Sequence, residues 1–137
     1  MNDRKLFFIV FPAANLGLVF YGLLALLMPG ILLEPFSLNI YQFPAQATSA
    51  TTYLEALFRL LGFFNMIPGF VGLMLVYRLR TTWQPWILQT VVASTAFSYL
   101  GPMVFDNTVG SIGVFEVVEH ILFVLVVILG IILWREK

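Results

Sequence analysis

The segment TTYLEALFRLLGFFNMIPGFVGLMLVYRLR, residues 51–80, decides the fold of this chain. It is apolar and long enough to cross a bilayer, because a helix of about 20 apolar residues spans roughly 30 Å of hydrocarbon. At helical spacing its polar residues and its glycines share one stripe, which consists of Glu55, Arg59, Gly62, Asn65, Gly69 and Gly72. Such a stripe is suited to packing against other helices and poorly suited to lipid.

The composition of the whole chain is typical of a membrane protein. Of its 137 residues, 61% are hydrophobic and 10% are charged, whereas about 25% of the residues in a soluble domain are charged. A formal net charge of zero gives no reason to expect a nucleic-acid partner. The chain has no cysteine and one histidine, which argues against disulfides, thiolate catalysis and a bound metal. No nucleotide, haem or flavin motif occurs, so the sequence identifies no cofactor.

Four segments reach the length of a membrane span. They are roughly residues 6–28, 53–77, 83–105 and 114–134. The connection 29–52 contains three prolines, which prevent one continuous helix. It is either a plain connection with a few aromatic residues at the membrane interface, or a segment that lies on the membrane or covers the end of the bundle. The sequence therefore predicts one domain, residues 1–137, with an all-α fold of four up-and-down transmembrane helices.

The basic residues predict the orientation of these spans. Six of them flank the spans on one side: Arg4, Lys5, Arg78, Arg80, Arg135 and Lys137. The opposite connections, residues 29–52 and 106–113, contain none. Because cytoplasmic loops carry an excess of Lys and Arg, we expect both termini in the cytoplasm and a bacterial inner membrane as the location.

Small residues predict how the first two spans pack. We expect the glycines of the second span to face small residues of the first, in a seam formed by Gly62, Gly69, Gly72, Gly17, Gly22 and Ala25. Asn15 and Asn65 each lie about midway along their spans, where a hydrogen bond between them would join the two helices. A bundle this small exposes much surface, so we also expect a homo-oligomer or a larger membrane assembly.

Ionisable residues gather near the predicted outer ends of two spans. Glu116, Glu119 and His120 share one face of the fourth span, and Glu55 and Arg59 lie near the outer end of the second. Ionisable groups in a membrane are costly, by about 2.5–3.5 kcal/mol each at mid-helix, and pairing lowers that cost. We therefore expect Arg59 to pair with Glu116 or Glu119, with Glu55 completing the network.

This cluster has two interpretations. As a pocket, the carboxylates and imidazole of Glu116, Glu119 and His120 would move a proton, and Arg59 with Glu55 would bind an anion or a lipid headgroup. Asn65 and Tyr99 are further candidates for contact with a ligand. As a structural cluster, the same ion pairs would fix the register of the helices.

The order of these features resembles that of small bacterial four-helix membrane proteins of the DoxX-like kind. The shared features are the basic start, the long first outer connection, Arg59 near the start of the second span and the acidic outer end of the fourth. The resemblance covers the whole chain in topology and implies a four-helix bundle. It carries no functional residues with it.

Three functions fit the sequence. The first is a non-enzymatic subunit of a membrane assembly, or a protein that binds a lipophilic small molecule or membrane lipid, with a polar cluster in the outer half of the bundle. The second is a membrane enzyme, for example an isomerase, that acts on a lipid-like substrate by acid–base chemistry. The third is a small proton-coupled carrier.

Overall fold

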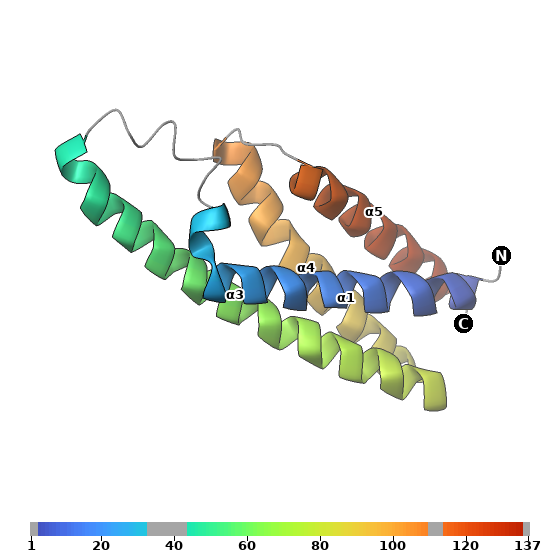
Figure 1. The fold of residues 1–137 in the computed structure, drawn as a ribbon. Coiled ribbons are helices and arrows are strands. Elements are labelled where there is room, and N and C mark those ends of the chain that lie inside the picture. The colour runs from blue at the N-terminus through green and yellow to red at the C-terminus, as the bar shows by residue number, and fades with distance from the viewer. Residues whose placement is uncertain (1–2, 33–43, 110–113, 136–137) are drawn as a thin grey trace.

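The computed structural model of the protein describes residues 3–32, 44–109 and 114–135. It contains four long helices: α1 (Asp3–Leu27), α3 (Pro44–Thr81), α4 (Pro85–Val109) and α5 (Val114–Arg135) (Figure 1). Each of them is long and apolar enough to cross a membrane. The predicted all-α fold with four candidate spans is therefore confirmed for the described part of the chain.

Helix α3 begins earlier than the sequence predicted. The prediction ended the outer connection at residue 52, whereas the helix already begins at Pro44 and runs for 38 residues. Proline is favoured in the first turn of a helix, because its fixed φ suits the helix and its missing N–H would have no partner there. Pro44 therefore starts a helix within the segment that was predicted to be a connection. The rest of the predicted connection lies largely outside the described residues.

Helix α1 lies at the centre of the arrangement. It packs against each of the other three helices, most extensively against α3, and α4 packs against both α3 and α5. Within the described ranges, α3 and α5 do not pack against each other. Both termini lie at one end of the bundle, which we call the termini end, and α1 and α5 diverge toward the far end (Figure 1).

The seam between α1 and α3 is largely the one predicted. A Cβ atom added at Gly62 would lie 2.6 Å from the carbonyl oxygen of Gly22 and 2.9 Å from the Cβ of Ala25. One added at Gly69 would lie 2.9 Å from the carbonyl oxygen of Asn15. The two backbones are thus too close for larger side chains, which is the arrangement that small residues permit. Gly17 is the exception, because its neighbour is the hydroxyl of Tyr99 on α4.

The predicted hydrogen bond between Asn15 and Asn65 is not formed. Asn15 is fully buried, and its Nδ2 donates to the carbonyl oxygen of Phe11 at 2.8 Å and to Oγ1 of Thr95 at 3.2 Å. The register of the antiparallel seam explains the difference. Gly72, and not Asn65, lies opposite the Asn15 side chain, which occupies the space that a Cβ at Gly72 would need.

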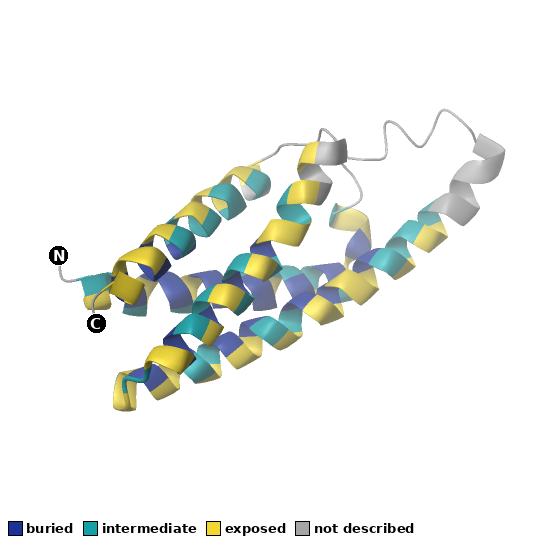
Figure 2. Cartoon of the chain, turned by 180° about the vertical axis from the view of Figure 1, so that it is seen from behind, coloured by how far each residue is buried: buried dark blue, intermediate teal, exposed yellow. Residues whose placement is uncertain are grey.

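Apolar side chains fill the core and also cover the outside. The buried residues line the inner faces of the helices, and the exposed ones cover the outer faces (Figure 2). Four aromatic rings pack together near the termini end, those of Phe7, Phe8, Phe11 and Trp83. The exposed faces carry large apolar side chains, including Phe20, Phe63, Phe64 and Phe70. An apolar exterior of this extent fits a hydrocarbon environment far better than water.

Candidate functional site

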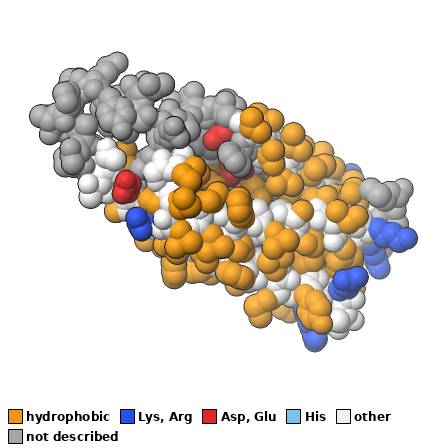
Figure 3. Space-filling model, in the orientation of Figure 1, with side chains coloured by type: hydrophobic (Ala, Val, Ile, Leu, Met, Phe, Trp, Pro, Cys, Tyr) orange, Lys and Arg blue, Asp and Glu red, His pale blue; other side chains and the backbone are white. Residues whose placement is uncertain are grey.

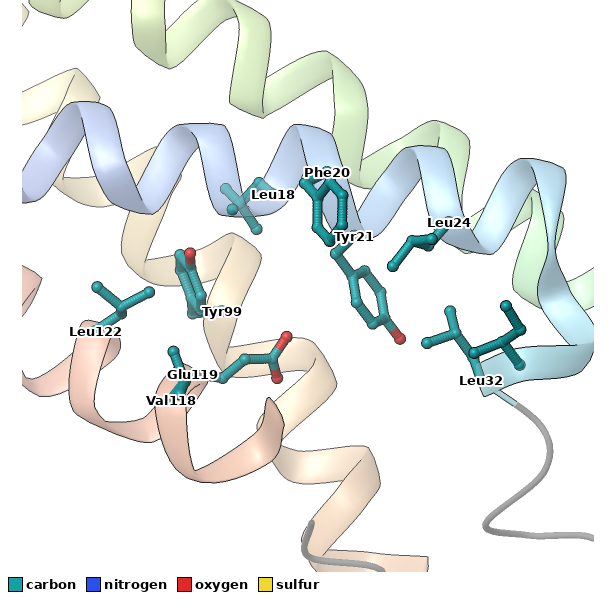
Figure 4. Close-up of a pocket in the computed structure, with 11 residues that line it drawn as sticks. Leu18, Phe20, Tyr21, Leu24, Leu32, Tyr99, Val118, Glu119 and Leu122 are labelled. Atoms are coloured by element: carbon teal, nitrogen blue, oxygen red, sulfur yellow. The ribbon is translucent and has the colours of Figure 1, made fainter. Parts of the chain in front are cut away.

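A pocket of about 210 Å³ lies between α1, α4 and α5, toward the far end of the bundle (Figure 4). Its walls come from the second half of α1 and the turn after it, from one residue of α4, and from the start of α5. The lining residues are Gly17, Leu18, Phe20, Tyr21, Leu24, Ile31, Leu32, Tyr99, Val118, Glu119 and Leu122. Because α1 and α5 diverge toward this end, their side chains and those of α4 do not fill the space between the three helices.

The pocket has a buried floor and an exposed rim. Leu18 and Tyr99 are almost completely buried and form the floor. Phe20 and Ile31 are 60% and 51% exposed and belong to the rim. Apolar side chains on the outside of the bundle thus border the pocket.

Tyr99 joins the pocket to the framework of the bundle. Its hydroxyl donates to the carbonyl oxygen of Ala14 at 2.7 Å, which ties α4 to α1. A Cβ at Gly17 would lie 3.0 Å from the same hydroxyl, so the glycine leaves room for it. Tyr99 was predicted as a ligand contact. The structure places its ring in the pocket wall and its hydroxyl on a backbone carbonyl.

Glu119 is the acidic residue among the described residues that line the pocket. Its carboxylate extends from α5 into the space between α5 and α1, with Tyr21 on the opposite wall (Figure 4). Of the three residues predicted as acid–base candidates on the fourth span, Glu119 is the one in the pocket wall. Glu116 and His120 do not contribute to the lining.

His120 instead connects the end of α4 to the start of α5. Its Nδ1 lies 2.6 Å from the carbonyl oxygen of Glu116, and its Nε2 lies 3.1 Å from Nδ2 of Asn107. A carbonyl oxygen accepts only, so Nδ1 carries the hydrogen and Nε2 accepts from the Asn107 amide. The same amide also donates to the carbonyl oxygen of Met103 at 2.7 Å. Both nitrogens of the imidazole are thus used: Nδ1 in a contact within α5, and Nε2 in the contact between α4 and α5.

Arg59 lies away from this pocket, and the predicted pair with Glu116 or Glu119 is wrong. Its Nη1 donates to the carbonyl oxygen of Leu26 at 3.2 Å, in the last turn of α1. The last four carbonyls of a helix have no partner within the helix, and a cation is favourable there, which explains the position of the guanidinium. Glu55, four residues earlier on α3, is likewise not part of the pocket lining.

Sequence reasoning missed the largest part of the site, which α1 supplies. Gly17, Tyr21 and Leu24 recur at intervals of four and three, so they share one helical face, and this spacing was the available signal. Of these three residues, Gly17 was assigned instead to the seam with α3, and Tyr21 and Leu24 were given no role. Asn65, a further predicted ligand contact, is buried on α3 and does not reach the pocket.

These features define a small multi-pass helical membrane protein with an apolar pocket between its helices. No family model, curated protein or solved structure matches the chain. The topological resemblance to DoxX-like proteins therefore stays a prediction, and the class rests on the helices and the pocket themselves.

Proposed function

We propose that the protein binds a lipophilic small molecule in the pocket between α1, α4 and α5 and does not transform it. The observation that supports this proposal is the pocket itself, with apolar walls and a single carboxylate among the described residues that line it. A dry cavity of about 150 Å³ holds benzene, and pockets for drug-sized ligands measure about 300–1,000 Å³. A space of about 210 Å³ thus suits one ring with a small substituent, or a short alkyl segment of a lipid.

The separation of the polar residues argues against the acid–base enzyme. That hypothesis needed the carboxylates, the imidazole and the guanidinium around one substrate. Glu119 lies in the pocket, His120 is held between Asn107 and the carbonyl of Glu116, and Arg59 is bonded to α1. A general base must reach the proton that it removes, directly or through one water. The proposed function therefore assigns the pocket to binding.

The proposal places the four helices in a bacterial inner membrane with both termini in the cytoplasm. Five described cations lie toward the termini end: Arg4, Lys5, Arg78, Arg80 and Arg135. Figure 3 shows Lys and Arg side chains gathered at that end. Because cytoplasmic flanks are enriched in Lys and Arg, this end would face the cytoplasm and the pocket would lie in the outer half. Association into a homo-oligomer or a larger assembly stays a prediction.

A pair of adjacent valines provides the test of binding. Val118 lines the pocket and Val117 does not, and their side chains are almost equally exposed, at 49% and 48%. The full chain is placed in phosphatidylcholine nanodiscs, and binding of tert-butylbenzene is measured by equilibrium dialysis with empty nanodiscs subtracted. Val118→Trp fills the rim of the pocket, so we expect it to weaken binding on the order of tenfold. Val117→Trp should leave binding unchanged.

Either of two results would contradict the proposal. One is a wild-type protein that retains no more tert-butylbenzene than empty nanodiscs do. The other is an equal effect of the two tryptophans, which would mean that the probe binds elsewhere on the apolar surface. Mass spectrometry of small molecules that co-purify with wild type and are lost in Val118→Trp would identify the natural ligand.

A further inference from the structure

We infer that the pocket selects a ligand with a cationic ammonium group, held by Glu119 and by the faces of neighbouring aromatic rings. The inference rests on the proposed function and narrows it to a class of ligand. It depends on the charge of the lining and on the aromatic residues that line the pocket together with Glu119.

The charge of the lining favours a cation. Glu119 is the one charged residue among the described residues that form the walls. Toward the far end of the bundle, α3 carries the cation Arg59. Its guanidinium donates to the carbonyl of Leu26 and is not part of the pocket lining. The other described basic residues belong to the opposite end of the bundle. In a medium of low dielectric constant, one carboxylate strongly attracts a cation and strongly repels an anion.

Aromatic rings surround the same space. Phe20 and Tyr21 line the pocket from α1, and Tyr99 lines it from α4 (Figure 4). Because the hydroxyl of Tyr99 is bonded to the Ala14 carbonyl, this residue offers its ring to a ligand. The negative faces of aromatic rings attract ammonium groups, and cages of such rings bind quaternary ammonium ligands. Three rings and one carboxylate are the components of a site of this kind.

Three probes of closely similar shape test the inference. Phenyltrimethylammonium, tert-butylbenzene and benzenesulfonate each carry a ring with a three-branched substituent, and they differ in charge. Their dissociation constants are measured on the full wild-type chain in phosphatidylcholine nanodiscs, with empty nanodiscs subtracted. We expect the ammonium probe to bind at least about tenfold more tightly than the sulfonate. This comparison needs no variant, so it does not depend on the folding of any substitution.

Two matched substitutions then test whether the charge of Glu119 causes the preference for the ammonium probe. Glu119→Gln removes the charge at nearly constant shape, so binding of the ammonium probe should fall on the order of tenfold or more. Binding of tert-butylbenzene should change by less than about twofold, which shows that the pocket remains intact. Glu116→Gln removes a carboxylate three residues away that is not part of the lining, and it should leave both constants unchanged.

Equal or tighter binding of benzenesulfonate would overturn the inference. So would an equal loss of the ammonium and neutral probes in Glu119→Gln, since Glu119 would then support the shape of the pocket and not its selectivity. In both cases binding of tert-butylbenzene to wild type would leave the proposed function standing. If that neutral probe does not bind to wild type, the proposed function itself fails.

Discussion

At the scale of single residues, a buried polar pair ties two helices together inside the bundle. Asn15 and Thr95 are both fully buried, one on α1 and one on α4. The Thr95 hydroxyl lies 3.4 Å from Oδ1 of Asn15 and accepts from its Nδ2 at 3.2 Å. In the described part of the chain, no buried side-chain nitrogen or oxygen lacks a partner. Unpaired polar groups are expensive in such an environment, so this pair should specify how α1 meets α4.

The Thr95→Val variant should therefore destabilise the bundle modestly. It keeps the shape of the side chain and removes the hydroxyl, and hydrogen bonds between membrane helices contribute about 0.6 kcal/mol on average and about 1.7 at most. Thr90→Val is the matched control, because the exposed Thr90 hydroxyl bonds only to the carbonyl of Trp86 in its own helix, at 2.9 Å. Unfolding by sodium dodecyl sulfate in mixed micelles measures both variants. Equal unfolding free energies for the two would contradict the role assigned to Asn15 and Thr95.

At the scale of helices, the close contact of α1 with α3 organises the molecule. The atoms that approach Gly62 most closely include the backbone carbonyl of Gly22 and the backbone nitrogen of Leu26. Backbone atoms cannot rotate away as a side chain can, so the contact tolerates no additional atom. In a membrane, this dispersion contact replaces the hydrophobic driving force that holds helices together in water.

The Gly62→Ala variant should separate these two helices. The added methyl group forces a shift of backbone, at a cost of about 1–3 kcal/mol, although alanine favours the helix more than glycine does. Gly30→Ala is the control, since a Cβ at Gly30 meets open space. The midpoint of thermal unfolding in detergent should fall for Gly62→Ala and stay constant or rise for Gly30→Ala. A midpoint that Gly62→Ala leaves unchanged would show that the seam yields to an extra methyl group.

The periodicity of a sequence predicts which residues share one face of a helix, and this limits how much of the fold and of the site could be predicted. The spacing of Gly62, Gly69 and Gly72 correctly predicted a stripe that packs against the first helix. It could not determine the register, and a shift of less than two turns places Gly72 opposite Asn15 instead of Asn65. Nor could it determine which helices are neighbours. Arg59 and Glu119 have similar predicted depths, but α3 and α5 lie on different sides of α1.

At the scale of the whole molecule, the distribution of charge predicts a topology. The described cations other than Arg59 lie toward the termini end, and the connection between α3 and α4 lies at the same end (Figure 1). If that end faces the cytoplasm, Gly30, after α1, faces the outside. Thr82, between α3 and α4, faces the inside.

Single cysteines test this topology directly, because the chain has none of its own. Gly30→Cys and Thr82→Cys are expressed separately, and both positions are exposed in the structure. A membrane-impermeant maleimide should label Gly30→Cys in intact cells and Thr82→Cys only after lysis. The unmodified chain controls for background labelling. The reverse labelling pattern would mean that the orientation in the membrane is opposite to the predicted one, with the pocket in the cytoplasmic half.

The exposed apolar residues that border the pocket suggest where a ligand comes from before it binds. The rim at Phe20 and Ile31 faces the surroundings of the bundle, and in a bilayer these surroundings are acyl chains. The reservoir for the site is then the membrane, where an amphiphile that partitions strongly can be far more concentrated than in the aqueous phase. Occupancy will follow the ratio of amphiphile to phospholipid, so adding empty vesicles at constant total amphiphile should lower it.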